Sequence, residues 1–292
     1  FIFSKTDTIF PMCLCGFINF NQVIISIVIR KFKIVNPKKM STLKIAGLNL
    51  DIVWKNKEEN FRIIENEFST IEADIFLLPE MFSTGFCMEA EEVADRNNES
   101  LTWMKSFAKS KNSAVAGSVS VEDGGKFYNR FYFVFPDGNY EYYDKRHLFS
   151  YSGEDKVYTA GIERKIVEYK GFRILLQVCF DLRFPVFSRN QDDYDSILYV
   201  ANWPSSRVEA WKSLLKARSI ENQAFLFGLN RIGTDGYKND YEESSQVYFP
   251  DGKEISEREN NVVLSEWNLE ELTEFRTKFP FLDERDGFEI NL

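Results

Sequence analysis

The chain has 292 residues, of which 44% are hydrophobic and 28% are charged, as in an ordinary globular protein. Its formal net charge of −9 argues against extended binding to nucleic acid or to an anionic membrane. Four cysteines fit no compact disulfide framework in a chain of this length, and a single histidine excludes a histidine-rich metal site. We therefore expect a cytoplasmic protein that needs no metal or other cofactor.

The first 39 residues differ in character from the rest of the chain. Their apolar run, residues 23–29, is far too short to span a membrane, and the flanks of a signal peptide are missing. From Met40 the sequence reads as the opening strand of a globular protein. We expect residues 1–39 to be an extension outside the fold, or the product of a misassigned start, and residues 40–292 to form one domain.

Hydrophobic periodicity predicts alternating helices and strands in that domain. Helical spacing of apolar residues marks 56–71, 99–112 and 207–223, and Asn268 can cap a last helix. Runs or alternations of apolar residues predict strands at 40–50, 73–78, 114–121, 129–135, 140–144, 165–169, 172–178, 196–201, 224–230, 246–249 and 262–267. This order, with its hairpins, indicates a layered α/β sandwich.

A cysteine follows the most distinctive of these strands. Residues 174–178 are typical of a strand buried on both faces, and Cys179 comes directly after them. Pro185 suits the first turn of a helix. Cys179 is thus expected at the carboxyl end of a core strand, where α/β folds bind ligands and where a sharp turn can expose a nucleophile.

Two other strands end in groups that could assist a thiol, namely Glu80 and Lys145. A glutamate can take the proton of Cys179 and return it to a leaving amine, while a lysine can stabilise an oxyanion. The backbone N–H of Phe180 can supply a second oxyanion donor. Taken singly, Glu80 and Lys145 also fit a solvated strand end and a surface charge, and spacing leaves their convergence open.

The segments around these residues resemble the three signature segments of the nitrilase superfamily, the carbon–nitrogen hydrolases. The matching stretches are 79–82 (PEMF), 144–149 (DKRHLF) and 178–185 (VCFDLRFP). The resemblance implies a single-domain, four-layer α-β-β-α sandwich that forms a homodimer or larger homo-oligomer. It also implies Glu80 as general base, Lys145 as oxyanion-stabilising residue, Cys179 as nucleophile, and Glu154 as a second glutamate that orients the lysine.

Three further stretches, 145–149, 201–204 (ANWP) and 275–280 (FRTKFP), are similar to the omega-amidase branch. That branch hydrolyses the side-chain amide of 2-oxoglutaramate or 2-oxosuccinamate through a cysteine thioester. The carboxylate of such a substrate needs a cation, for which Arg207 is our candidate. We expect Phe82 and Trp203 to shape the pocket, and Arg183 to pair with Asp181 in the nucleophile turn.

Three alternatives remain open at this stage. The chain could belong to another branch of the same superfamily, acting on N-carbamoyl compounds or aliphatic amides. It could be a cysteine peptidase, in which His147 would be the base. It could also be a binding protein without catalysis, although the presence of all three chemical groups argues against this.

Overall fold

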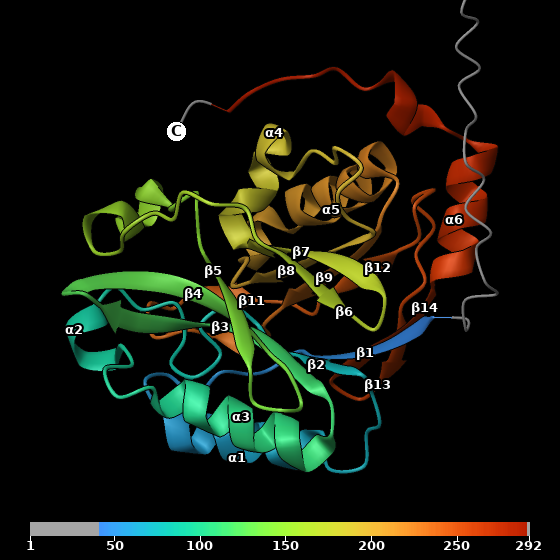
Figure 1. Ribbon diagram of the computed structural model, residues 1–292. Coiled ribbons are helices and arrows are strands. Elements are labelled where there is room, and N and C mark those ends of the chain that lie inside the picture. Colours follow the sequence, from blue (N-terminus) through green and yellow to red (C-terminus); the bar gives the residue numbers. More distant parts are fainter. Residues whose placement is uncertain (1–40, 291–292) are drawn as a thin grey trace, which may run out of the picture. The chain divides into compact units, whose positions relative to one another are not determined.

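The computed structural model describes residues 41–290, so the prediction for residues 1–39 lies outside the described residues. Two sheets dominate this part (Figure 1). The seven-stranded sheet has the order β13-β14-β1-β2-β3-β4-β5 and the five-stranded sheet the order β12-β9-β8-β7-β6. The strands of the first are β1 (Thr42–Leu48), β2 (Ile75–Leu77), β3 (Ala114–Asp123), β4 (Lys126–Val134), β5 (Tyr140–Asp144), β13 (Glu257–Glu259) and β14 (Val262–Asn268). Those of the second are β6 (Ile166–Tyr169), β7 (Phe172–Val178), β8 (Ser196–Ala201), β9 (Phe225–Asn230) and β12 (Gln246–Tyr248).

Helices cover the outer face of each sheet, while the inner faces pack against each other. The main core joins apolar residues of both sheets, among them Ile45, Phe131, Ile174 and Phe227. A second core lies under α1 (Lys57–Glu67) and α3 (Glu99–Lys111), and a third under α5 (Val208–Asn222). Figure 1 shows α1 and α3 on one side and α5 on the other. The predicted α-β-β-α layering is thereby confirmed.

The predicted elements agree with the structure except at their ends and for a few short pieces. Asn268 caps α6 (Leu269–Lys278), because its side chain accepts a hydrogen bond from the N–H of Glu270 at 2.9 Å. The helix expected to begin at Pro185 is α4 (Pro185–Ser188). The pieces that sequence reasoning missed include α2 (Ala90–Val93), β13 and the hairpin of β10 (Gly233–Thr234) with β11 (Asp240–Tyr241). Each is four residues or fewer, too short for a periodic pattern to show.

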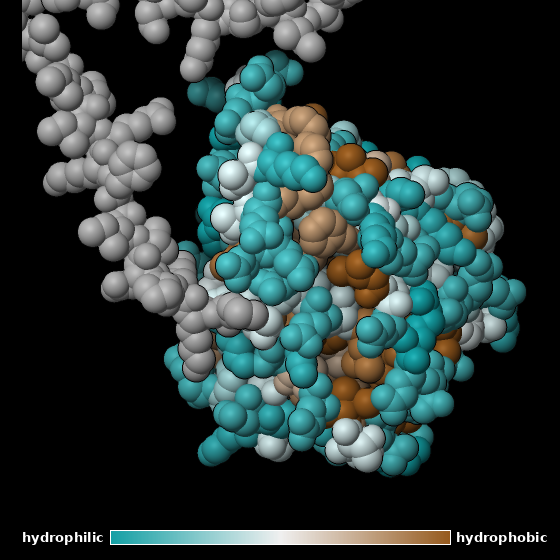
Figure 2. Space-filling model, turned by 90° about the vertical axis from the view of Figure 1, so that its right-hand side faces the viewer, coloured by the Kyte–Doolittle hydropathy of each residue, from teal (hydrophilic) through white to brown (hydrophobic). Residues whose placement is uncertain are grey.

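Apolar side chains on the face that bears α6 form a narrow strip between hydrophilic ones (Figure 2). Within residues 41–290 no helix combines the length and the apolar character that crossing a membrane requires.

The feature that matters most for function is the direction of the central strands. β1, β2 and β3 run parallel in one sheet, and β7, β8 and β9 run parallel in the other. Their carboxyl ends carry the residues discussed next.

Candidate active site

The turn after β7 carries Cys179. The 3-10 helix η3 (Cys179–Arg183) begins directly at this residue, whose φ of +46° lies in the left-handed region. Residues with a side chain rarely adopt this conformation, and a strained strand-to-helix turn presents its side chain clear of the sheet. The carboxylate of Asp181 fixes the turn by accepting a hydrogen bond from the N–H of Val178 at 2.9 Å.

Three charged side chains meet beside this turn, and each is fully buried. The Nζ of Lys145, just past β5, donates to Oε1 of Glu80 at 2.9 Å. It also donates to Oε1 and Oε2 of Glu154 at 3.0 and 2.9 Å. Glu80 follows β2, and Glu154 opens the short helix η2 (Glu154–Lys156). The structure thus brings together the four residues that the sequence predicted as a catalytic group.

A close approach to β3 places Glu80. A Cβ atom on Gly117 would lie 2.8 Å from the Cβ of Leu78, so only glycine lets the segment 78–82 pass so near to the strand. Met81 adopts a positive φ of 47°, and its N–H donates to Oγ of Ser118 at 3.0 Å. This turn directs the carboxylate of Glu80 inward, and its side chain is fully buried.

Two asparagines that sequence reasoning missed complete the surroundings of Glu80. Asn129 on β4 donates from Nδ2 to Oε1 of Glu80 at 2.8 Å, and the N–H of Asn202 donates to Oε2 at 2.8 Å. Asn202 lies directly after β8, within the 201–204 stretch that already resembled the omega-amidase branch, so the sequence could have indicated it as a site residue. Asn129 lies within a predicted strand, where a single sequence offers no signal.

The electrostatics of the group follow from burial and from mutual charge. Burial lowers the pKa of Lys145, but the carboxylates of Glu154 and Glu80 outweigh it and hold that pKa above its ordinary value. Burial raises the pKa of Glu154, and Lys145 acts in the opposite direction. Burial, reinforced by the charge of Glu80, raises the pKa of the Cys179 thiol well above its ordinary value. The lysine is therefore charged at neutral pH, and the thiol keeps its proton until a base removes it.

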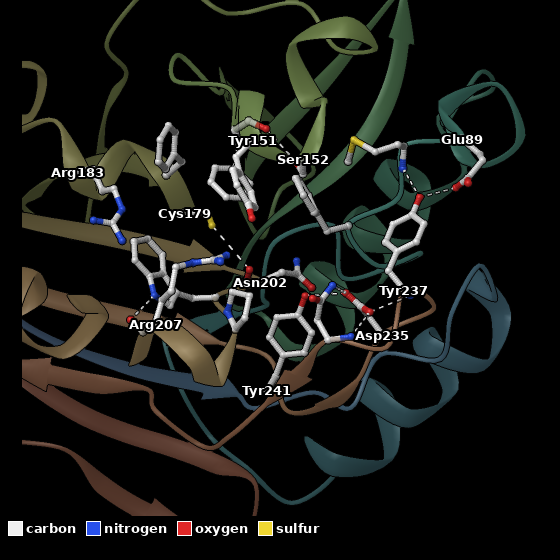
Figure 3. A pocket seen from close by; sticks show the side chains of 17 residues that line it. Glu89, Tyr151, Ser152, Cys179, Arg183, Asn202, Arg207, Asp235, Tyr237 and Tyr241 are labelled. Carbon is white, nitrogen blue, oxygen red and sulfur yellow. Dashed lines mark hydrogen bonds between the residues drawn. The ribbon is translucent and has the colours of Figure 1, made fainter. Parts of the chain in front are cut away.

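The thiol opens into a pocket of about 830 Å³ (Figure 3). Residues of five separate segments line it, including Phe86, Phe149, Phe180, Trp203, Arg207 and Tyr237. Figure 3 shows Arg183 and Arg207 on the side of Cys179, and Glu89 with Tyr237 on the far side. The Nζ of Lys145 lies 5.2 Å from the ring centroid of Phe86, so the ammonium lies next to the pocket wall.

The expected ion pair between Arg183 and Asp181 is absent from the described structure. Asp181 is fully buried and accepts instead from the hydroxyl of Tyr143 at 2.9 Å and from the N–H of His147 at 3.0 Å. Nδ1 of His147 lies 2.7 Å from Asp181 as well. Arg183 is exposed because the turn directs it outward, over the ring of Trp203 at 5.0 Å. Asp181 thus links the lysine-bearing loop to the nucleophile turn.

His147 does not take the position of a base beside the thiol. Its ring stacks on Phe184 with centroids 3.8 Å apart, and the residue does not line the pocket. Glu80 is the basic group whose charge and hydrogen bond act on Cys179. The cysteine-peptidase alternative, which required His147 as base, is wrong.

The expectation for Phe82 is also wrong. Its ring is fully buried in the core under α1 and α3, near Phe61 and Trp103, because it points to the opposite side of the turn from Glu80. Phe86, four residues further on, lines the pocket instead. Trp203 and Arg207 do lie in the pocket wall, and Phe180 lines it next to the sulfur. Nε1 of Trp203 donates to the carbonyl of Arg207 at 2.8 Å, which ties these two residues together.

Comparison with known proteins identifies the family to which a chain with this arrangement belongs. The family model described as carbon-nitrogen hydrolase matches residues 44–277. The chain belongs to the carbon-nitrogen hydrolase family. A relative named omega-amidase YafV from Yersinia enterocolitica is 43% identical over 253 residues, covering 85% of this chain and 99% of that protein. The protein of the same name from Escherichia coli K12 is 42% identical, covering 86% and 100%. A 2-oxoglutaramate amidase from Bacillus subtilis is 34% identical, covering 82% and 96%.

Solved structures of this family share the fold. XC1258 from Xanthomonas campestris, a CN-hydrolase superfamily protein described with an arsenic adduct in its active site, has a TM-score of 0.82 and 38% identity. The match covers 86% of this chain and 99% of that one. Nit3 from Saccharomyces cerevisiae, of the nitrilase superfamily, has a TM-score of 0.72 at 20% identity, covering 82% and 95%. These likenesses agree with the layered sandwich described above.

Proposed function

We propose that this carbon-nitrogen hydrolase is an omega-amidase, which hydrolyses the side-chain amide of 2-oxoglutaramate and 2-oxosuccinamate to the dicarboxylate and ammonia. The observation that carries the proposal is the meeting of Glu80, Lys145 and Cys179 beside a pocket whose wall holds Arg207. The names of relatives that are 42–43% identical over nearly their whole length support the same substrate class.

In the first half of the reaction, Glu80 takes the proton of Cys179 and the sulfur attacks the amide carbon. The resulting oxyanion is stabilised by Lys145 and by the N–H of Phe180, and one such donor is typically worth roughly 10²–10³ in rate. Glu154 holds the lysine in place through two hydrogen bonds. Glu80 then gives its proton to the leaving nitrogen, so ammonia departs and a thioester remains on Cys179.

In the second half, a water molecule attacks the thioester. Glu80, deprotonated again after ammonia has left, takes a proton from that water and returns one to the sulfur when the acid leaves. The oxyanion donors serve the second tetrahedral intermediate in the same way. Because each half-reaction returns the proton to where it began, the group of charged residues ends the cycle unchanged.

Two arginines favour a substrate with a carboxylate. Within residues 41–290 the guanidinium groups of Arg183 and Arg207 make no ion pair or hydrogen bond, and they stand over the rings of Trp203 and Phe149 at 5.0 and 5.2 Å. Of the pocket's own carboxylates, Glu89 pairs with Lys55 at 3.6 Å, and Asp235 accepts a hydrogen bond from the hydroxyl of Tyr241 at 2.7 Å. The two guanidinium groups on the side of Cys179 thus keep their donors free for the anionic end of a 2-oxo acid.

Ammonia release by the purified protein tests the proposal. We expect 2-oxoglutaramate to be hydrolysed at least ten times faster than N-carbamoyl-β-alanine or acetamide at equal concentration, and the Cys179→Ala variant to release none. Faster release from the carbamoyl compound would support the alternative branch, and no turnover of 2-oxoglutaramate would defeat the substrate assignment.

We further propose that the enzyme works in the cytoplasm as a homodimer or larger homo-oligomer, in keeping with the family resemblance and with its few cysteines. Light scattering of the purified chain at micromolar concentration should give at least twice the mass of one chain. A monomeric mass with full activity would contradict the oligomer.

A further inference from the structure

Asn129 is an amide on the side of β4 that otherwise builds the main core. Residues two and four positions further along the strand, Phe131 and Phe133, share its face and belong to that core. Asn129 is fully buried among them. A buried amide costs free energy unless each of its polar atoms is paired, so its presence here calls for specific partners.

The partners of Asn129 are the charged residues of the site. Nδ2 donates to Oε1 of Glu80 at 2.8 Å and lies 3.2 Å from Oε1 of Glu154. Its backbone carbonyl accepts the N–H of Lys145 at 2.9 Å. One residue therefore contacts both glutamates through its side chain and the lysine through its backbone.

A further hydrogen bond fixes which way the amide points. Oδ1 of Asn129 accepts from the hydroxyl of Ser118 at 2.8 Å, and the same hydroxyl accepts the N–H of Met81 at 3.0 Å. The opposite orientation would place Oδ1 against two carboxylates, which is repulsive. The N–H groups of Asn129 must therefore face Glu80 and Glu154.

We propose that Asn129 is a positioning residue of the reaction, which holds Glu80 as an ionised and correctly directed base without adding charge to the site. The proposal rests on the amidase function proposed above. Two buried carboxylates beside one ammonium tend to share a proton, which would leave the base unable to accept another from Cys179. A neutral donor that lies closer to Glu80 than to Glu154 favours the negative charge on Glu80.

The pH dependence of this role involves a small set of groups. The charged and titratable side chains that face Glu80 or its direct neighbours are Lys145 past β5, Glu154 in η2, Cys179 in η3, Tyr158, which interacts with Glu154, and Tyr241, which interacts with Cys179. The side-chain amide of Asn129 donates to carboxylate oxygens of this group, so its removal takes a hydrogen-bond donor from the charged form of the group. The acid limb of kcat/KM, which reports the essential base, should therefore move to higher pH.

Two substitutions separate positioning from mere structure. We expect Asn129→Ala to lower kcat for 2-oxoglutaramate roughly 10- to 100-fold, with KM changed less than about threefold, and to shift the acid limb upward by about one pH unit. Asn129→Asp, the closest match in shape, should shift the limb further, because the new carboxylate shares a proton with Glu80. If Asn129 served only to fill its place in the core, the order would be reversed. The Asn129→Asp variant would then show the smaller loss of kcat and the smaller shift of the acid limb. Val134→Ala, in the same strand but away from the site, serves as a control for lost stability alone.

Alkylation of Cys179 by iodoacetamide, followed by mass spectrometry against pH, gives a second readout that needs no substrate turnover. The acid limb of the alkylation profile should lie at the lowest pH in the wild type, at a higher pH in Asn129→Ala and at the highest pH in Asn129→Asp. The positioning role of Asn129 would be overturned if the alkylation profiles of both variants coincided with that of the wild type. It would also be overturned if Asn129→Ala lowered kcat no more than Val134→Ala does. Failure of the wild type to hydrolyse 2-oxoglutaramate would instead defeat the proposed function, and the alkylation profiles would still decide the role of Asn129.

Discussion

The two cysteines in the described part of the chain, Cys87 and Cys179, carry the same side chain in contrasting surroundings. Both are free thiols. Burial raises the pKa of Cys87 to about 12, with a hydrogen bond to Glu89 adding to the effect. Burial likewise raises the pKa of Cys179 well above its ordinary value. A raised pKa by itself therefore does not distinguish a structural thiol from a nucleophilic one.

The difference lies in the groups that can act on each sulfur. Sγ of Cys87 lies 2.9 Å from Oε2 of Glu89, but the hydroxyl of Tyr237 donates to the same oxygen at 2.7 Å, and Cys87 itself is fully buried. Cys179 lines the pocket, stands at a strained turn, and has both Glu80 and the ammonium of Lys145 acting on it. Reactivity thus comes from an available base, a nearby positive charge and access for a carbonyl group.

The largest expected effect comes from removing one sulfur or the other. Cys179→Ala should lower kcat by roughly 10⁴-fold or more, because the covalent route is lost. Cys87→Ala should keep kcat within about threefold of the wild type. Ammonia release from 2-oxoglutaramate measures both, and a Cys87→Ala enzyme as inactive as Cys179→Ala would erase the contrast between the two sites.

Replacing Lys145 by methionine tests the positive charge near the nucleophilic thiol. Loss of an oxyanion donor should lower kcat by roughly 10²–10³-fold. The variant should also lose about 3–5 kcal/mol of unfolding free energy in urea, because two carboxylates stay buried without their cation. Adding Glu154→Gln should restore part of that stability and none of the activity. Recovery of activity in the double variant would argue against the oxyanion role.

Substitution of Arg207 tests access of the correct substrate to Cys179. Arg207→Ala should raise KM for 2-oxoglutaramate roughly 10- to 100-fold with little change in kcat, since a charged hydrogen-bond partner of the carboxylate is removed. For acetamide, which has no carboxylate, kcat/KM should stay within about threefold of the wild type. Arg183→Ala is the matched variant on the same side of the pocket. Equal losses on both substrates would mean that Arg207 acts through the structure of the wall rather than through charge.

A smaller effect is expected at His147, which contacts Asp181 in the nucleophile turn through its backbone N–H and its ring. His147→Ala should lower kcat by roughly three- to tenfold, because Asp181 loses a side-chain partner, and His147→Asn, which keeps an N–H donor, should recover most of it. Steady-state kinetics on both variants provide the comparison. A loss as large as that of Cys179→Ala would be expected only of a general base.

The smallest effect concerns stability at alkaline pH and again involves Cys87. Its pKa of about 12 in the folded chain exceeds the ordinary thiol value near 8.5, so its contribution to folding is complete below about pH 8.5 and falls as pH rises toward 12. In a Cys179→Ala background, Cys87→Ala should be less stable at pH 7, with the difference shrinking by less than about 1.4 kcal/mol per pH unit above 8.5. Urea unfolding at pH 7 and pH 10 measures this, and a constant difference would mean that the thiol titrates normally.

Local patterns in the sequence determined most of the secondary structure and the residues of the nucleophile turn. The apolar run before Cys179 predicts β7, because a strand buried on both faces needs continuous apolar side chains. Motifs around Glu80, Lys145 and Cys179 identified the family, and Glu154 followed from that resemblance.

Contacts between residues far apart in the chain were decided only by the tertiary structure. Asn129 and Glu80 are 49 positions apart, and no periodicity in either segment reports their 2.8 Å hydrogen bond. Phe82 packs in the core under α1 and α3, and Arg183 lies over Trp203, so both contact residues other than those expected. The direction of a side chain at a turn depends on backbone angles that packing fixes. A pattern along the chain records which face of an element is buried. Only the packed sheets decide which polar group meets which, since pairing energies depend on distances of a few ångströms.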